Sequence, residues 1–422
     1  MKILKLFFPG RFEDVHLYMG RLILLTEHRS IRVLSLERIV TKLEQQYPDF
    51  ASIPTLMFLR NDHLASELFR LLLRDHAMAE SILAALKGFP QPYAEIKLED
   101  IRSDELTLNL RSQIVLDTVL YNRRLYIGAD DGFFHVDLTL SPDGTSEMEG
   151  KPQKRLDARC VRALAGYGGV NASCGNAGLY TALDEFGSGP KRMSKTAERS
   201  LRATWLDQAL INYPTYSTPE LHRSSYEVPE YRSRSDDPDR KMVTFIDPEA
   251  VDLAYLFESL IVKYDISREA IQYAFNSNNT VFVNTFDGQF YAIGLKREGK
   301  TDRPTFEYAR SYNRTRNHHR ARVLSSSPVR YGEVIETEDQ VLLFANKQWS
   351  VLEDSEVLSV RTFRNSKRYQ NIVALTKEDG VILVSLFDAE GSAENQMRVS
   401  RSRSRRTQIR TLETRSETDH PR

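Results

Sequence analysis

Short runs of β-favouring residues, separated by polar turns, recur along the whole chain. Three of them share one pattern, in which Asp-Gly stands between two apolar runs: Tyr126–Val136, Val281–Ile293 and Val373–Val384. Looser copies cover Leu22–Leu36, Val170–Leu183 and Val341–Leu352. Asp-Gly in this setting favours a tight hairpin turn of type I′, with positive φ at both central residues. The pattern therefore predicts a series of antiparallel hairpins.

Several copies follow a further apolar run and a polar turn, as at Ile114–Leu120, Ile271–Phe275 and Val357–Phe363. Strand, turn, strand, Asp-Gly turn, strand is a meander, and short meanders that recur along a chain are typical of propeller blades. The sequence therefore predicts an all-β fold, a β-propeller of six or seven blades covering residues 1–390. Over most of its length it resembles the divergent WD40-like propellers, although the Gly-His and Trp-Asp signatures of WD40 repeats are missing.

Two interruptions break the spacing of the hairpins. Apolar residues recur every three or four positions between Asn61 and Gly88, which predicts an α-helical insertion at about 50–90, with Asn61 as a cap and Gly88 as its end. Its apolar stripe either packs against the β-propeller or forms a partner-binding arm. A polar stretch with several prolines at about 187–240 predicts a long loop insertion.

The charge of the chain is balanced, with 58 Lys and Arg against 58 Asp and Glu. No global field attracts a nucleic acid or a membrane, and any electrostatic targeting must come from local clusters. No apolar run reaches the length of a membrane span or a signal-peptide core, so a cytoplasmic location is expected. Cys160 and Cys174 lie on the two arms of one predicted hairpin, and whether they pair depends on its turn length.

Catalytic and metal-binding motifs are missing from the sequence: it has no Gly-x-Ser-x-Gly elbow, complete Walker A loop, His-Glu-x-x-His or paired Cys-x-x-Cys. Asp131, Asp287 and Asp379 could instead suggest acid catalysis or calcium binding, but their place in predicted turns already explains them. We therefore expect no cofactor, no metal and no catalytic residue.

One local cluster is rich in arginine and tyrosine and almost free of acids. We hypothesise that it binds a partner through Tyr308, Arg310, Tyr312, Arg314, Arg316, Arg320 and Arg322. In an extended segment these arginines share a face, from which they could bind an acidic protein or, with the tyrosines stacking on bases, a nucleic acid. A solvated loop is the simpler alternative. The end of the chain, 391–422, is also rich in Arg and Ser and predicts a disordered tail that could contact RNA.

Taken together, these features predict a non-enzymatic scaffold for protein–protein interaction, whose insertions bind another protein of unknown identity. Two alternatives remain open. One is a nucleic-acid-binding protein that uses the Arg/Tyr cluster and the basic tail. The other is a propeller enzyme in which three or more carboxylates converge on the central channel.

Overall fold

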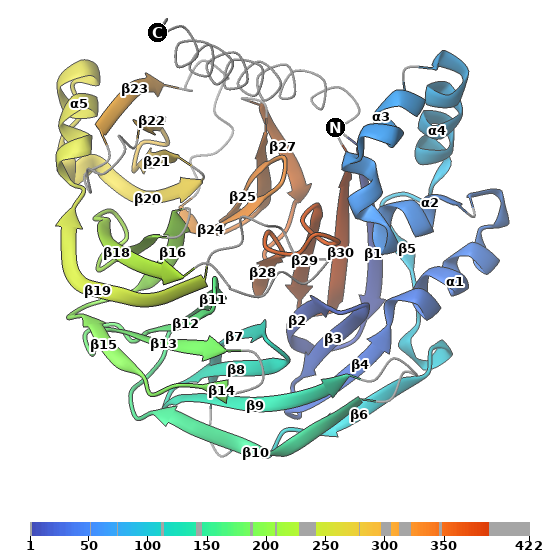
Figure 1. The fold of residues 1–422 in the computed structure, drawn as a ribbon. Coiled ribbons are helices and arrows are strands. Elements are labelled where there is room, and N and C mark those ends of the chain that lie inside the picture. The colour runs from blue at the N-terminus through green and yellow to red at the C-terminus, as the bar shows by residue number, and fades with distance from the viewer. Residues whose placement is uncertain are drawn as a thin grey trace, which may run out of the picture.

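The computed structural model describes residues 2–50, 52–73, 75–110, 114–140, 146–185, 189–206, 209–227, 242–277, 279–296, 305–311, 322–345 and 348–387. In this part of the chain the strands form seven sheets, which Figure 1 shows arranged around a common centre. The predicted tail at 391–422 and much of the Arg/Tyr cluster lie outside the described residues.

The sheets are numbered here in chain order. The first sheet consists of β2 (Phe12–Tyr18), β3 (Arg21–Thr26), β4 (Ser30–Ser35) and β6 (Ser103–Thr107). The second consists of β7 (Val115–Tyr121), β8 (Arg124–Ala129), β9 (Phe133–Leu140) and β10 (Ser146–Leu156). The third consists of β11 (Arg162–Gly166), β12 (Gly169–Ser173), β13 (Leu179–Glu185), β14 (Gly189–Pro190) and β15 (Ser194–Ala197).

The fourth sheet consists of β16 (Arg202–Leu206), β17 (Ala209–Tyr213), β18 (Glu220–Glu227) and β19 (Met242–Asp252). The fifth consists of β20 (Ile271–Ser277), β21 (Thr280–Thr285), β22 (Phe290–Lys296) and β23 (Thr305–Ser311). The sixth consists of β24 (Val323–Val329), β25 (Gly332–Thr337), β26 (Val341–Ala345) and β27 (Gln348–Glu353). The seventh consists of β28 (Ser359–Thr362), β29 (Ile372–Lys377), β30 (Gly380–Phe387), β1 (Lys2–Pro9) and β5 (Ala94–Glu95).

The two ends of the described chain meet in the seventh sheet. Strand β1 pairs with β30 in antiparallel register along its whole length, from Lys2 opposite Phe387 to Pro9 opposite Gly380. The first strands of neighbouring sheets also contact one another in a closed cycle, β2 to β7, β11, β16, β20, β24, β28 and back to β2. The fold is a β-propeller.

The hydrophobic core is divided among the interfaces between sheets. The described residues form seven apolar clusters, and each lies between one pair of neighbouring sheets. Inner strands such as β26 and β30 are buried at every position, because both of their faces are covered by another sheet. This explains why these strands read as continuous apolar runs and not as a polar–apolar alternation.

The predicted hairpins are present, but their turn geometry differs from the prediction. Asp-Gly joins β8 to β9, β21 to β22 and β29 to β30. Positive φ occurs at Gly288 (φ 80) but at none of the three aspartates. At Gly380 the reason for glycine is close approach, since a Cβ there would lie 2.4 Å from the Phe8 carbonyl oxygen. Consecutive positive φ values occur instead at Met19–Gly20, Asn122–Arg123 and Tyr167–Gly168, each in the first turn of a sheet.

Among the described residues, four α-helices lie between β4 and β6, and a fifth lies between the fourth and fifth sheets (Figure 1). They are α1 (Leu36–Gln46), α2 (Ser52–Pro54), α3 (Glu67–Leu72), α4 (His76–Gly88) and α5 (Tyr255–Tyr264). Shorter turns are η1 (Pro48–Phe50), the π-helical η2 (Thr55–Leu59), η3 (Asn61–Ala65), η4 (Leu98–Asp100) and η5 (Arg268–Ala270). Gly88 ends α4 as predicted.

The prediction that Asn61 caps a helix is wrong. Its side-chain amide is buried and donates to the Met57 carbonyl and to Ser385 Oγ of β30, at 2.8 and 2.9 Å. Ser35, Ser66 and Asp75 cap α1, α3 and α4. Asn61 therefore ties the helical insertion to the propeller.

The long loop predicted at about 187–240 is also wrong for most of its length. The described residues in this range form β14, β15, β16, β17 and β18. Strands β16 and β17 pair across a short connection, from Arg202 opposite Tyr213 to Leu206 opposite Ala209. Prolines and polar residues hid these strands, because β-propensity is set largely by the packing around a strand and is weak evidence by itself.

Candidate functional site

An arginine that is largely covered joins three of the first strands around the centre of the ring. Arg361 of β28 donates from Nε to Asp14 Oδ1 of β2 at 2.8 Å, and its Nη2 contacts both Asp14 and Asp117 of β7. Thr118 Oγ1 donates to Asp14 Oδ2 at 2.6 Å. One guanidinium thus holds the seventh, first and second sheets together, although its partners lie 347 and 244 residues away along the chain.

Two carboxylates therefore meet at the centre of the ring, fewer than the three that the enzyme alternative requires, and both are ion-paired with Arg361. Burial alone would raise the pKa of Asp14, but the charge and hydrogen bonds of Arg361 outweigh it and hold this pKa well below its usual range. Asp117 accepts a further hydrogen bond from the Ala163 amide of β11 at 2.7 Å. Both carboxylates are buried and ion-paired, so we interpret this cluster as a structural clamp between sheets and not as an acid–base pair.

Two other acidic side chains, Glu333 and Glu336, have pKa values shifted in the opposite direction, upward. Burial raises the pKa of Glu336, which accepts a hydrogen bond from Ser325. Burial also raises the pKa of Glu333 in β25 to about 8, despite the nearby Ser277 hydroxyl, Arg364 and Arg202. No group of three or more His, Cys, Asp or Glu side chains suited to a metal ion is found in the described ranges.

The raised pKa of Glu333 predicts a measurable pH dependence. The unfolded carboxyl ionises near 4.5 whereas the folded one keeps its proton to about pH 8, so stability falls as the pH rises between these values. Glu333→Gln should therefore raise the free energy of unfolding by about 2 kcal/mol or more at pH 8 and much less at pH 5. Urea unfolding at both pH values checks this. The exposed Glu356→Gln is the control, and an equal gain at both pH values would contradict the prediction.

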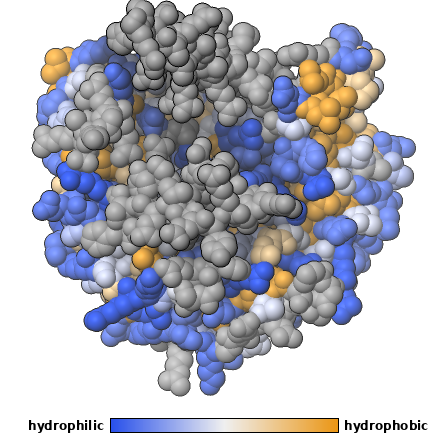
Figure 2. All heavy atoms as spheres, viewed as in Figure 1, coloured by the Kyte–Doolittle hydropathy of each residue, from blue (hydrophilic) through white to orange (hydrophobic). Residues whose placement is uncertain are grey.

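The helical insertion carries a cluster of large apolar side chains on its outside. The exposed fractions are 69% for Leu68, 51% for Leu71, 39% for Leu72 and 44% for Met78. Figure 2 shows hydrophobic residues gathered in this region of α3 and α4. We call these four residues the α3–α4 surface. Single exposed apolar residues are ordinary, but several on successive helices of one insertion are typical of an interaction site.

The same insertion is fixed to the propeller by its other face. Helix α1 buries Leu36, Ile39, Val40 and Leu43, a helical spacing that places all four on one side. Phe69 of α3 packs edge-on against Phe387 of β30, with 5.9 Å between ring centroids. One side of the insertion therefore packs on the propeller and the other remains exposed, and the binding of a partner by that exposed side stays a prediction.

The Arg/Tyr cluster is only partly described. Tyr308 and Arg310 lie on β23, and the Arg310 guanidinium sits 4.6 Å from the centroid of the Tyr308 ring. Tyr308 in turn lies against Gly294 of β22. Arg310 and Arg322 are exposed. Tyr312, Arg314, Arg316 and Arg320 lie outside the described residues, so their place on a shared face stays a prediction.

The two cysteines are free buried thiols. Strands β11 and β12 are joined by a two-residue turn, Tyr167–Gly168, so Cys160 and Cys174 are offset by one position and not directly opposed. The neighbouring Cys174 thiol and burial together raise the pKa of Cys160, whose Sγ donates to the Arg162 carbonyl at 3.3 Å.

Comparison with known proteins identifies no family. No protein-family model and no curated protein matches the chain. Solved structures of similar fold include the β-propeller domain of Cps50 (Swd1) from Myceliophteria thermophila, with a TM-score of 0.45 and 8% identity over 89% of this chain and 96% of that one. The WD40 β-propeller domain of Doa1 has a TM-score of 0.41 and 9% identity over 90% and 98%. Sqt1 from Chaetomium thermophilum has a TM-score of 0.42 and 8% identity over 89% and 81%.

At such low identity the similarity concerns the fold alone and says nothing about a ligand or partner. No helix in the described residues is long and apolar enough to cross a membrane.

Proposed function

We propose that this protein is a non-enzymatic interaction scaffold that binds another protein through the α3–α4 surface. The exposed cluster of Leu68, Leu71, Leu72 and Met78 is the observation that carries the proposal. Burying these side chains in an interface would remove apolar area from water, at roughly 25 cal/mol per Å² before the costs of association. The entropy cost of ordering the surface on binding is lowered, because the insertion is already ordered by its contacts with β30 and β1.

The channel supports the non-enzymatic side of the proposal. Its two central carboxylates are committed to Arg361, which leaves them poorly suited to exchange protons during a reaction. A cytoplasmic location belongs to the proposal as well, supported by two thiols that remain unpaired.

The Arg/Tyr cluster is proposed as a secondary contact for an acidic segment of the partner. Arg310 and Arg322 are exposed and could pair with carboxylates. The described part favours a protein over a nucleic acid, because one face of Tyr308 is covered by Arg310 and the ring also lies against Gly294. A base would have to displace one of these contacts before it could stack.

The proposal is tested with Leu68→Asp/Leu71→Asp. Both residues are more than half exposed, so the variant should keep the melting temperature within a few degrees while losing its partner. Affinity purification followed by identification of co-purifying proteins, with the intact chain beside the variant, measures that loss. The control is Val262→Asp, which places the same charge on an 82% exposed apolar site of α5.

A protein captured by the intact chain and by Val262→Asp, but not by the double variant, supports the α3–α4 surface. Retention of every partner by a folded double variant would refute it. The surface could be occupied by a different protein or by a second copy of this chain. Sedimentation of the purified chain distinguishes them, because a second copy bound to this surface would dissociate in the double variant.

A further inference from the structure

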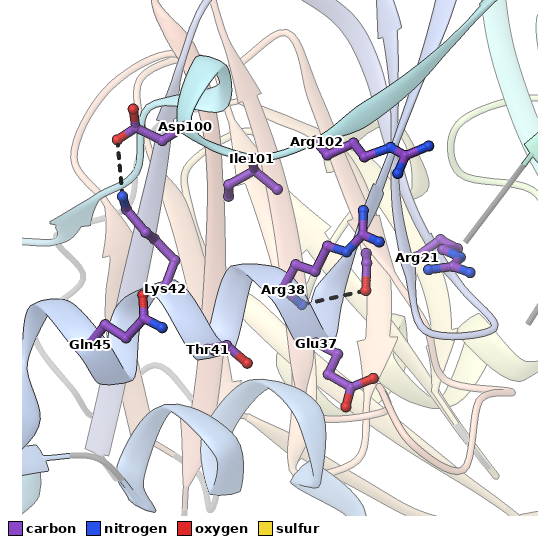
Figure 3. Close-up of a pocket in the computed structure, with 10 residues that line it drawn as sticks. Arg21, Glu37, Arg38, Thr41, Lys42, Gln45, Asp100, Ile101 and Arg102 are labelled. Carbon is purple, nitrogen blue, oxygen red and sulfur yellow. Dashed lines mark hydrogen bonds and ion pairs between the residues drawn. The ribbon is translucent and has the colours of Figure 1, made fainter. Parts of the chain in front are cut away.

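A basic pocket lies on the first sheet, between helix α1 and the segment that leads into β6 (Figure 3). Its volume is about 480 Å³, within the range of small-molecule sites. Four basic side chains line it, Arg21, Arg38, Lys42 and Arg102, against two acidic ones, Glu37 and Asp100. The pocket thus has a surplus of two positive charges in a chain whose net charge is zero.

The charges inside the pocket are not evenly paired. Lys42 Nζ lies 3.6 Å from Asp100 Oδ2, so these two largely neutralise each other. Within the described part of the chain, the side chains of Arg38 and Arg102 make no hydrogen bond or ion pair. In Figure 3 the Arg38 guanidinium points up from α1 toward Arg102 and Arg21, whereas the Glu37 carboxylate points down. Figure 3 thus shows the three guanidinium groups on one side of the pocket and the Glu37 carboxylate on the other.

The backbone that carries these arginines is held in place. Arg21 opens β3, Arg38 lies in the first turn of α1 and Arg102 directly precedes β6. The Leu36 amide donates to the Gly20 carbonyl at 2.9 Å, which fixes the start of α1 to the turn before Arg21. Ile39 and Ile101, each next to one of the other arginines, are buried in the same apolar cluster. Segments far apart in sequence thus present their charges from a common rigid base.

We propose that this pocket binds a small molecule that carries phosphate groups with at least two negative charges. Guanidinium groups present fork-shaped donors that match phosphate oxygens, and several arginines around one site are typical of phosphate recognition. The helix terminus itself is not what binds, because the amides of Leu36 and Arg38 already donate to Gly20 and to Ser35 Oγ. The proposal does not depend on the α3–α4 surface, which lies on other helices of the insertion.

The test uses inorganic pyrophosphate, titrated into the full chain by calorimetry at low ionic strength, where screening is weakest. We expect saturable binding that becomes about tenfold weaker or more in Arg38→Gln/Arg102→Gln, since two charge-assisted contacts are lost. Arg192→Gln is the control because Arg192 is also exposed and lies outside the pocket. A thermal melt of each variant checks that the fold is kept.

A second arm distinguishes a soluble ligand from a lipid headgroup. Phosphatidylcholine vesicles with and without phosphatidylinositol bisphosphate are sedimented with the same variants. The pocket is supported if either ligand binds, if the double variant loses that binding and if Arg192→Gln keeps it. Whether pyrophosphate or the phosphoinositide vesicles bind then shows whether the ligand is a soluble phosphate or a lipid headgroup. Binding in neither arm, or equal weakening by Arg192→Gln, would overturn the proposal.

Discussion

Deleting residues 2–9 is expected to abolish cooperative folding of the whole ring. Strand β1 supplies eight register pairs to β30 and buries Leu4, Leu6, Phe7 and Phe8. At roughly 2 kcal/mol for each buried side chain, its burial contributes on the order of 8 kcal/mol. That is comparable to the entire stability of an ordinary domain, about 5–15 kcal/mol. The shortened chain would also expose the paired edge of β30, a template for aggregation.

Calorimetry and circular dichroism of the deletion variant test this expectation. A point substitution gives the graded version, because Phe8→Ala should cost about 3–5 kcal/mol by opening a cavity in the largest apolar cluster. Phe286→Ala, at a site 67% exposed, is the control and should change stability little. A deletion variant that still melts cooperatively at the original temperature would show that β1 does not close the ring.

Arg361→Met is the second change with a large expected effect. Removing the guanidinium leaves Asp14 and Asp117 buried without their counter-ion, and breaking a buried ion pair in this way costs about 3–5 kcal/mol. Arg162→Met is the matched control. Arg162 is half exposed and its Nη1 lies 3.9 Å from Asp117 Oδ1, so its loss should cost no more than about 1 kcal/mol.

The pH dependence distinguishes lost charge from lost packing at this site. The pKa of Asp14 is depressed in the folded chain, so its contribution to stability is present above the unfolded value of 3.8 and is lost as the pH falls through the folded value. The deficit of Arg361→Met relative to the intact chain should therefore shrink as the pH drops below about 4. Urea unfolding at pH 3 and pH 7 measures it. Equal deficits at both pH values would assign the effect to packing alone.

The local sequence pattern was sufficient to predict the repeated hairpin. Two β-rich runs around an Asp-Gly turn predicted the hairpins β8–β9, β21–β22 and β29–β30, because residues a few positions apart pair whatever the rest of the chain does. The reason offered for their glycines was incomplete. At Gly380 the constraint comes from the Phe8 carbonyl, on a strand more than three hundred residues away along the chain. Contacts of this kind leave no trace in the spacing of neighbouring residues.

The two proposed sites also differ in how far the sequence could predict them. Helical spacing of apolar residues between Asn61 and Gly88 predicted the insertion, but the sequence left open whether its stripe packs on the propeller or forms a partner-binding arm. Which leucines remain outside was settled by Phe69, whose ring packs on Phe387. The pocket arginines carry no signal at all, since Arg21, Arg38 and Arg102 belong to segments that only the fold of the first sheet brings together.

The sequence by itself determined that this protein is built from repeated antiparallel hairpins with a helical insertion, because strand alternation, turn residues and helical spacing are properties of neighbouring positions. The tertiary structure alone decided how the ring closes, since the pairing of β1 with β30 joins the two ends of the described chain. It also decided that Asp14 and Asp117 are clamped by Arg361, because a buried charge finds its partner by proximity in space and not in sequence.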